Sequence, residues 1–159
     1  MALEPVCTHD LAPIELQLVR HEGLRLYPYN DTTGHQTIGV GRNLTDVGIS
    51  EAEAYVLLRN DIAKVRAGLM ADYRFFATLD EVRQRVLIDM AFNLGRKGLG
   101  TFQNFLRAVA RGDYADAAQE MLKSRWADQV GKRAHTLSAM MESGEVPADA
   151  FPVIAWPGC

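Results

Sequence analysis

The chain has 159 residues, of which 48% are hydrophobic, and a formal net charge of −3. This length is sufficient for one compact domain with a buried core, divided into two lobes. The acidic balance argues against nucleic acid as the main partner. No window approaches the roughly 20 apolar residues of a membrane span, and the N-terminus lacks the basic cluster and apolar run of a signal peptide. We therefore expect a soluble protein made in the cytoplasm, without stable membrane insertion.

Charge is unevenly distributed along the chain. Residues 1–60 hold 4 Lys/Arg and 8 Asp/Glu, residues 61–138 hold 13 and 9, and residues 139–159 hold 0 and 3. A basic middle beside an acidic first part suits a cleft for a polyanionic polymer. An ordinary mixed surface explains the pattern equally well.

The cysteines and histidines do not have the spacing of a metal site. Cys7 and Cys159 lie near opposite ends, and the four histidines are scattered at positions 9, 21, 35 and 135. We expect no metal and no other cofactor. Free thiols are favoured over a disulfide joining the ends, because the sequence does not supply the geometry that a disulfide needs.

The first predicted element is a helix that ends at Glu22. Pro13 suits a helix start, Ile14, Leu18 and Glu22 follow at four-residue steps, and Gly23 suits the position after a helix end. Glu22 therefore continues an apolar stripe. It is either a solvated residue at a fraying end or a partly desolvated acid that lines a cavity.

Residues 24–41 have the pattern of a β-hairpin. The runs RLYPY and HQTIGV are separated by the turn-rich segment NDTTG. Pro28 confines its strand to a sheet edge, because proline has no N–H to donate. Gly39 and Gly41 indicate a bulge or a place where the backbone approaches another group closely.

A long amphipathic helix is predicted from Ser50, which forms a capping box with Glu53, to about residue 70. A second capping box, from Thr78 to Glu81, precedes an apolar helix expected to form the core of the second lobe. Its predicted core residues are Val82, Val86, Leu87, Met90, Ala91 and Leu94.

Further helices fit residues 101–111, 113–126 and 131–142, and the proline-containing tail is expected to be irregular and docked by Phe151 and Trp156. The fold class is α+β, mainly α. A small lobe covers about 14–49, a connecting helix about 50–70, a helical lobe about 71–142, and the tail 143–159.

Glu22, Asp31 and Thr37 carry the chemistry of the small lobe. Hydrolysis of a glycosidic bond needs one acid and a second carboxylate that acts as base or nucleophile. Desolvation on an apolar face would raise the pKa of Glu22 and suit it to the acid role, whereas Asp31 in a polar turn should stay ionised. Thr37 offers a hydroxyl that can orient the attacking water.

These residues resemble a known signature. EGLRL at 22–26, YNDTTG at 29–34 and TIGVG at 37–41 are similar to the bacteriophage-type lysozymes (endolysins) related to the T-even phage enzyme, with the family's Glu-x8-Asp-x5-Thr spacing. The resemblance continues through AFNLG at 91–95, GTFQNFLR at 100–107 and KSRW at 123–126, and covers about 14–142.

The resemblance implies a lysozyme-like two-lobed fold and a muramidase. Such an endolysin hydrolyses the β-1,4 bond between N-acetylmuramic acid and N-acetylglucosamine in peptidoglycan, with Glu22 as general acid and Asp31 and Thr37 handling the water. It also implies a monomer, made in the host bacterial cytoplasm, that reaches the wall after a holin-type helper permeabilises the membrane. The family favours inversion, which the residues themselves leave open.

The resemblance further places Asn43, Phe92 and Phe105 along the saccharide cleft, although a plain packing role explains each of them equally well. Arg42 stands where the family often has His. We expect Asp61 to draw this guanidinium away from Glu22, and Arg133 to approach Glu22 from the helical lobe.

Two other functions stay open. A lysozyme-fold protein could bind peptidoglycan without cutting it, although an intact Glu22, Asp31 and Thr37 set argues against a pure binder. A helical nucleic-acid-binding domain could use the basic middle, but the sequence has no helix-turn-helix pattern and no basic stripe with interleaved aromatics.

Overall fold

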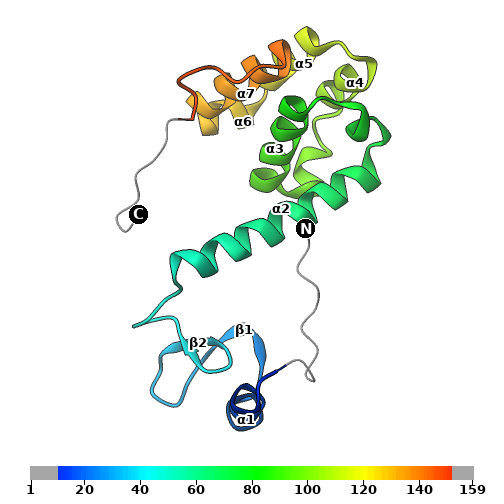
Figure 1. The fold of residues 1–159 in the computed structure, drawn as a ribbon. Helices are drawn as coiled ribbons and strands as arrows, with labels where there is room; N and C mark the ends of the chain where they lie inside the picture. The colour runs from blue at the N-terminus through cyan, green and yellow to red at the C-terminus, as the bar shows by residue number, and fades with distance from the viewer. Residues whose placement is uncertain (1–10, 152–159) are drawn as a thin grey trace. The chain divides into compact units, whose positions relative to one another are not determined.

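The computed structural model describes residues 11–151, which form two compact units that meet between Asn60 and Asp61 in the sequence. The predicted α+β, mainly α, fold class is confirmed: the described residues form helices and one small antiparallel sheet (Figure 1). No described helix combines the length and the apolar character that crossing a membrane requires. Cys7, Cys159 and Trp156 lie outside the described residues.

The small unit begins with helix α1 (Pro13–Glu22), followed by β1 (Arg25–Asn30), β2 (Gln36–Gly39) and β3 (Arg42–Asn43). The three strands pair antiparallel in the order β1-β2-β3, so the predicted hairpin is confirmed and a short third strand extends it. Pro28 lies on β1, which is an edge strand, as its missing N–H requires.

The predicted apolar stripe of α1 does not form a buried face in the described structure. Proline occupies the first turn, as expected, but α1 buries none of its side chains, and Ile14 and Leu18 are exposed. The helix ends at Glu22, and the next residue, Gly23, has a positive φ of 76° that other residues adopt only with strain.

Helix α2 (Glu51–Asp72) begins with the predicted capping box. Ser50 Oγ accepts a hydrogen bond from the Glu53 N–H at 3.2 Å, and Glu53 Oε2 accepts one from the Ser50 N–H at 2.7 Å. Two amides that a helix start would leave without partners are therefore satisfied reciprocally.

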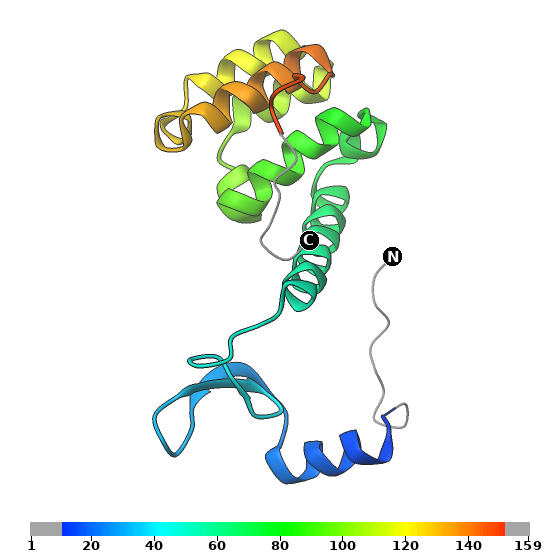
Figure 2. The same cartoon turned by 60° about the vertical axis from the view of Figure 1, so that its left-hand side comes forward.

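The helical unit continues after α2 through a 3-10 helix, Arg74–Thr78, and five α-helices. These are α3 (Glu81–Leu99), α4 (Gln103–Arg111), α5 (Tyr114–Leu122), α6 (Arg125–Val130) and α7 (Lys132–Ser143). Figures 1 and 2 both show α5 and α7 side by side, in agreement with the contacts between these helices.

Two sequence predictions in this unit are wrong in detail. The cap of α3 is Asp80, whose side chain accepts from the Arg83 N–H, whereas Thr78 belongs to the preceding 3-10 helix and bonds the Phe75 carbonyl. The single helix expected over 113–126 is two helices, because Ser124 accepts from the Ala127 N–H and starts α6.

The core of the helical unit is formed by apolar side chains from α2, α3 and the helices that follow. Most of the residues predicted for α3 are buried in it, and Val82 and Leu94 pack against it with part of their surface exposed. Its largest fully buried side chains include Phe76, Phe105, Leu69, Leu87, Met90, Leu99, Met121, Leu137, Met140 and Met141. In the tail, Phe151 is 54% exposed, although the Arg85 guanidinium lies 5.8 Å from its ring centre.

Candidate active site

Glu22 is the last residue of α1, and its side chain reaches the turn between β2 and β3. A Cβ built at Gly41 would lie 3.5 Å from Glu22 Oε2, so the carboxylate lies beside this glycine. This distance is an ordinary van der Waals contact, so the positive φ of 71°, and not lack of space beside Glu22, favours glycine at position 41. Glu22 is nevertheless exposed in the described structure, so the desolvation expected from its place on an apolar stripe is not observed there.

Asp31 lies in the turn between β1 and β2, where one of its carboxylate oxygens is fully engaged. Oδ1 accepts hydrogen bonds from the Thr33 N–H at 2.8 Å, the Thr33 hydroxyl at 2.7 Å and the His35 N–H at 2.9 Å. The Thr33 hydroxyl, the His35 N–H and the Thr33 N–H together hold the pKa of Asp31 below its ordinary value. The expectation that Asp31 stays ionised in a polar turn is thus supported.

The second oxygen of Asp31, Oδ2, has a different environment. Its closest charged or potentially charged neighbour among the described contacts is His35 Nδ1, at 3.8 Å, which is beyond hydrogen-bond length. Within residues 11–151, Oδ1 is therefore anchored by three donors, whereas Oδ2 has no hydrogen bond.

Thr37 lies on β2, opposite Tyr29 of β1 and Asn43 of β3. It is only 4% exposed, and its hydroxyl donates to the His35 carbonyl at 3.3 Å. In this arrangement the hydroxyl proton points to the backbone rather than to a carboxylate, and the oxygen keeps its capacity to accept.

Arg42 has a different partner from the one predicted. Its Nη1 and Nη2 contact Glu53 Oε2 and Oε1 at 3.0 and 2.8 Å, and Nη1 also donates to the Gly48 carbonyl at 3.2 Å. The expected pairing with Asp61 is therefore wrong: Glu53 draws Arg42 to the start of α2. The sequence identified Glu53 only as a capping residue. Its carboxylate accepts hydrogen bonds from both Ser50 and Arg42.

The bonds from Arg42, followed by those from the Ser50 N–H and hydroxyl, lower the pKa of Glu53 to about 2. Arg133, the other expected neighbour of Glu22, donates from Nε to Asp89 Oδ1 at 2.8 Å within the helical unit. Its approach to Glu22 stays a prediction.

The side-chain amide of Asn43 forms hydrogen bonds to the loop after β3. Its Nδ2 donates to Asp46 Oδ2 at 2.8 Å, and its Oδ1 accepts from the Asp46 N–H at 2.9 Å. These two bonds fix the loop that leads from the sheet to α2, so a structural role for Asn43 is visible, and sugar contact stays a prediction.

The two phenylalanines expected along the cleft have opposite environments. Phe92 is 46% exposed and lines an open cavity of about 390 Å³ in the helical unit, together with Asp61 and Lys64. Phe105 is 1% exposed and belongs to the core, although it forms part of the wall of a second open cavity of about 520 Å³. Packing is thus the main visible role of Phe105.

The second cavity brings together residues to which the sequence assigned no role. Its lining includes Gln103, Lys123, Arg125 and Trp126. Trp126 Nε1 donates to Asn93 Oδ1 at 2.9 Å, which satisfies the indole N–H of a side chain that is almost fully buried. These residues belong to the GTFQNFLR and KSRW runs of the sequence, which the fold brings together at one cavity.

Comparison with known proteins assigns the chain to a family. The phage lysozyme family model matches residues 19–141, so the chain belongs to the phage lysozyme family. This membership supports a lysozyme-type function.

Similar proteins include "Probable T4-type lysozyme 1" of Dictyostelium discoideum, which is 24% identical over 87% of this chain and 98% of that protein. An endolysin of Acyrthosiphon pisum secondary endosymbiont phage 1 is 34% identical over 72% of this chain and 78% of its own length. The pre-baseplate central spike protein Gp5 of Enterobacteria phage T4 is 27% identical over 81% of this chain, but only 27% of that protein is covered.

Proposed function

We propose that the protein is a muramidase that hydrolyses the β-1,4 bond between N-acetylmuramic acid and N-acetylglucosamine in peptidoglycan. The observation that carries the proposal is the state of Asp31: three donors anchor Oδ1 and lower the pKa of the carboxyl, while Oδ2 is left available. An ionised carboxylate that is held by one oxygen can receive a proton from water on the other, which is the role that a base for water performs.

Glu22 takes the role of general acid in this proposal. Its carboxyl stands at a helix end beside Gly41, where the absence of a side chain leaves space on one side of it. A protonated Glu22 gives its proton to the glycosidic oxygen as the bond to the anomeric carbon breaks. The exposed location of the carboxyl is compatible with substrate access.

Asp31 Oδ2 accepts a proton from the attacking water, and Thr37 contributes a lone pair that orients this water. Attack by water on the face opposite the leaving group inverts the anomeric carbon. In this reaction Glu22 loses one proton and Asp31 gains one, and proton exchange with solvent returns both groups to their starting states.

The test is the release of reducing ends from chemically defined peptidoglycan, with mass spectrometry of the fragments, by the wild type, Glu22→Gln and Glu51→Gln. The last variant removes an exposed carboxylate from the first turn of α2 and serves as the matched control. We expect fragments that end in reducing N-acetylmuramic acid from the wild type and Glu51→Gln, and none from Glu22→Gln.

Proton NMR of the fresh products would report the anomer, and an α-anomeric first product supports inversion. Wall binding without cleavage by the wild type would refute the muramidase proposal and favour a binding module. Cleavage that persists in Glu22→Gln would refute the role of Glu22 alone.

A further inference from the structure

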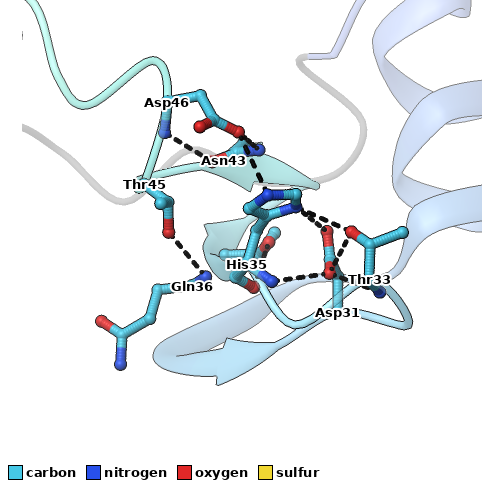
Figure 3. A network of polar contacts seen from close by, with 8 residues as sticks. Asp31, Thr33, His35, Gln36, Asn43, Thr45 and Asp46 are labelled. Atoms are coloured by element: carbon cyan, nitrogen blue, oxygen red, sulfur yellow. Dashed lines mark hydrogen bonds and ion pairs between the residues drawn. The ribbon is translucent and has the colours of Figure 1, made fainter.

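His35 lies between two carboxylates that belong to different segments of the small unit. Figure 3 shows its ring with Asp31 and Thr33 of the β1–β2 turn on one side and Asp46 of the loop after β3 on the other. The Nδ1 atom lies 2.7 Å from Thr33 Oγ1 and 3.8 Å from Asp31 Oδ2, and Nε2 lies 3.6 Å from Asp46 Oδ2. The ring therefore bridges two segments that are otherwise joined through the sheet.

The hydrogen-bond directions in this cluster follow from the number of protons available. A threonine hydroxyl has one proton, and Thr33 gives it to Asp31 Oδ1 at 2.7 Å. The contact between Thr33 Oγ1 and His35 Nδ1 then needs a proton from the ring. His35 is the donor, Thr33 is the relay, and Asp31 is the final acceptor.

The opposite side of the ring faces Asp46 of the loop after β3, which is held by bonds of its own. Asp46 Oδ2, which faces Nε2, also accepts from the Asn43 amide at 2.8 Å, and the neighbouring Thr45 hydroxyl accepts from the Gln36 N–H at 3.0 Å. Asp46 and Asp31 are the charged groups that face the ring among the described contacts. These bonds hold the loop after β3 and place Asp46 opposite Nε2, while Nδ1 on the other side of the ring contacts the Thr33 hydroxyl.

We propose that His35 is a positioning residue for Asp31: its ring orients the Thr33 hydroxyl, which holds the Asp31 carboxylate with Oδ1 anchored and Oδ2 free. This inference rests on the proposed function, in which Asp31 handles the water. His35 itself touches neither substrate nor reacting atoms. Its own N–H bond to Asp31 Oδ1 is a backbone bond that every substitution except proline retains.

The two ring nitrogens can be replaced one at a time. In His35→Asn the amide occupies the place of Nδ1 and can still donate to Thr33, but it does not extend to Asp46. In His35→Gln the amide reaches the place of Nε2 and loses the Thr33 contact. Thr33→Val removes the relay hydroxyl with little change of shape, and Thr33→Ser retains it.

The experiment has two readouts in the full-length protein: kcat and KM on defined peptidoglycan, and the pKa of the Asp31 carboxyl from carbon NMR. A misplacement of about 1 Å can reduce a rate by about 100-fold, so we expect kcat to fall at least about tenfold in His35→Gln and Thr33→Val, with KM within about twofold. In the same variants the pKa of Asp31 should rise, because the Thr33 hydroxyl is the largest cause of its low value. His35→Asn and Thr33→Ser should retain both quantities near the wild type.

If kcat and the Asp31 pKa are the same in His35→Gln and the wild type, the positioning role is overturned, while the muramidase proposal is unaffected. A lower kcat and a higher Asp31 pKa in His35→Asn as well as in His35→Gln would also overturn it, since His35→Asn retains the donor to Thr33. If the wild type does not cleave peptidoglycan, the proposed function fails separately, and the NMR titration still decides whether the ring controls the Asp31 carboxylate. Melting temperatures of all variants identify any that are unfolded.

Discussion

Arg42 and Glu53 form a two-point ion pair that joins β3 to the first turn of α2. The same Glu53 carboxylate accepts from the Ser50 N–H and the Ser50 hydroxyl, so one side chain both caps a helix and holds an arginine. Arg42 also donates to the Gly48 carbonyl. These contacts close the short connection between the sheet and the helix.

The ion pair predicts an acid-sensitive connection. The pKa of Glu53 is about 2 in the folded protein and 4.5 in the ordinary case, so folding favours its ionised form. The stabilisation is complete above about pH 4.5 and is lost as the pH falls toward 2. Urea unfolding of wild type and Glu53→Gln should therefore differ most near neutral pH and converge by about pH 2.

Glu51→Gln is the control, because it removes one negative charge from the same turn without touching Arg42. Both partners of the pair are partly exposed, so salt should narrow the difference between wild type and Glu53→Gln. A constant difference from neutral pH to pH 2 would contradict the assignment.

Removal of the Arg83 side chain should lower the stability of the protein more than removal of the Arg42–Glu53 pair does. Its Nε and Nη2 donate to the carbonyls of Met141 and Glu142 at 2.8 Å, its Nη1 contacts Asp80, and its guanidinium stacks 3.7 Å from the Tyr114 ring centre. These carbonyls belong to the last turn of α7, which has no further intrahelical donors.

Replacement of Arg83 by Ala should destabilise the protein by about 1–3 kcal/mol, the cost of leaving such groups unpaired. Arg83→Lys should recover only part of this loss. A lysine ammonium can still donate to a carbonyl, but it lacks the planar fork with which arginine donates to both. Thermal or urea unfolding measures both variants. If Arg83→Ala lowers the free energy of unfolding no more than Arg107→Ala, which removes an exposed arginine, the contacts of Arg83 do not stabilise the protein.

The contrast between Phe105 and Phe92 predicts which phenylalanine serves the core. Phe105→Ala should cost about 3–5 kcal/mol because it empties a buried site, whereas Phe92→Ala should cost roughly 1 kcal/mol. Phe76, equally buried in the core, provides the matched control for Phe105.

Activity separates packing from sugar contact. Phe105→Leu and Phe76→Leu should lose similar stability, and similar activity would assign Phe105 to packing alone. A selective rise of KM in Phe105→Leu would instead assign it to the glycan. For Phe92→Ala we expect a higher KM with little loss of stability, and an unchanged KM would remove Phe92 from the proposed binding surface.

The accuracy of the sequence predictions follows the range of the interactions involved. The Ser50 capping box, the Asp31 turn and the hairpin were predictable because each depends on residues within a few positions of one another. Similarly, the burial of Val86 and Met90 follows from helical periodicity.

The misses have physical causes of two kinds. At Thr78 and Asp80 two capping residues compete, and the structure uses the later one because the 3-10 turn occupies Thr78. Other features depend on pairs far apart in sequence: Arg83 with Met141, Trp126 with Asn93, and the place of Glu22 beside Gly41. Spacing alone does not select such partners from many equivalent candidates.

The position of Gly41 beside Glu22 gives the last prediction. Gly41 and Gly39 have nearly the same positive φ, 71° and 69°, so alanine at either position should cost a similar roughly 1–2 kcal/mol of backbone strain. An added methyl group meets Glu22 only at position 41, where it would lie 3.5 Å from Oε2 and 3.7 Å from Cγ, while position 39 has no atom within 4 Å. Gly41→Ala should therefore lose more of its peptidoglycan-cleaving activity than Gly39→Ala at equal loss of stability, as measured by initial rates beside urea unfolding. Equal activities would mean that the space beside Glu22 has no part in the reaction, and that both glycines serve only the turn from β2 to β3.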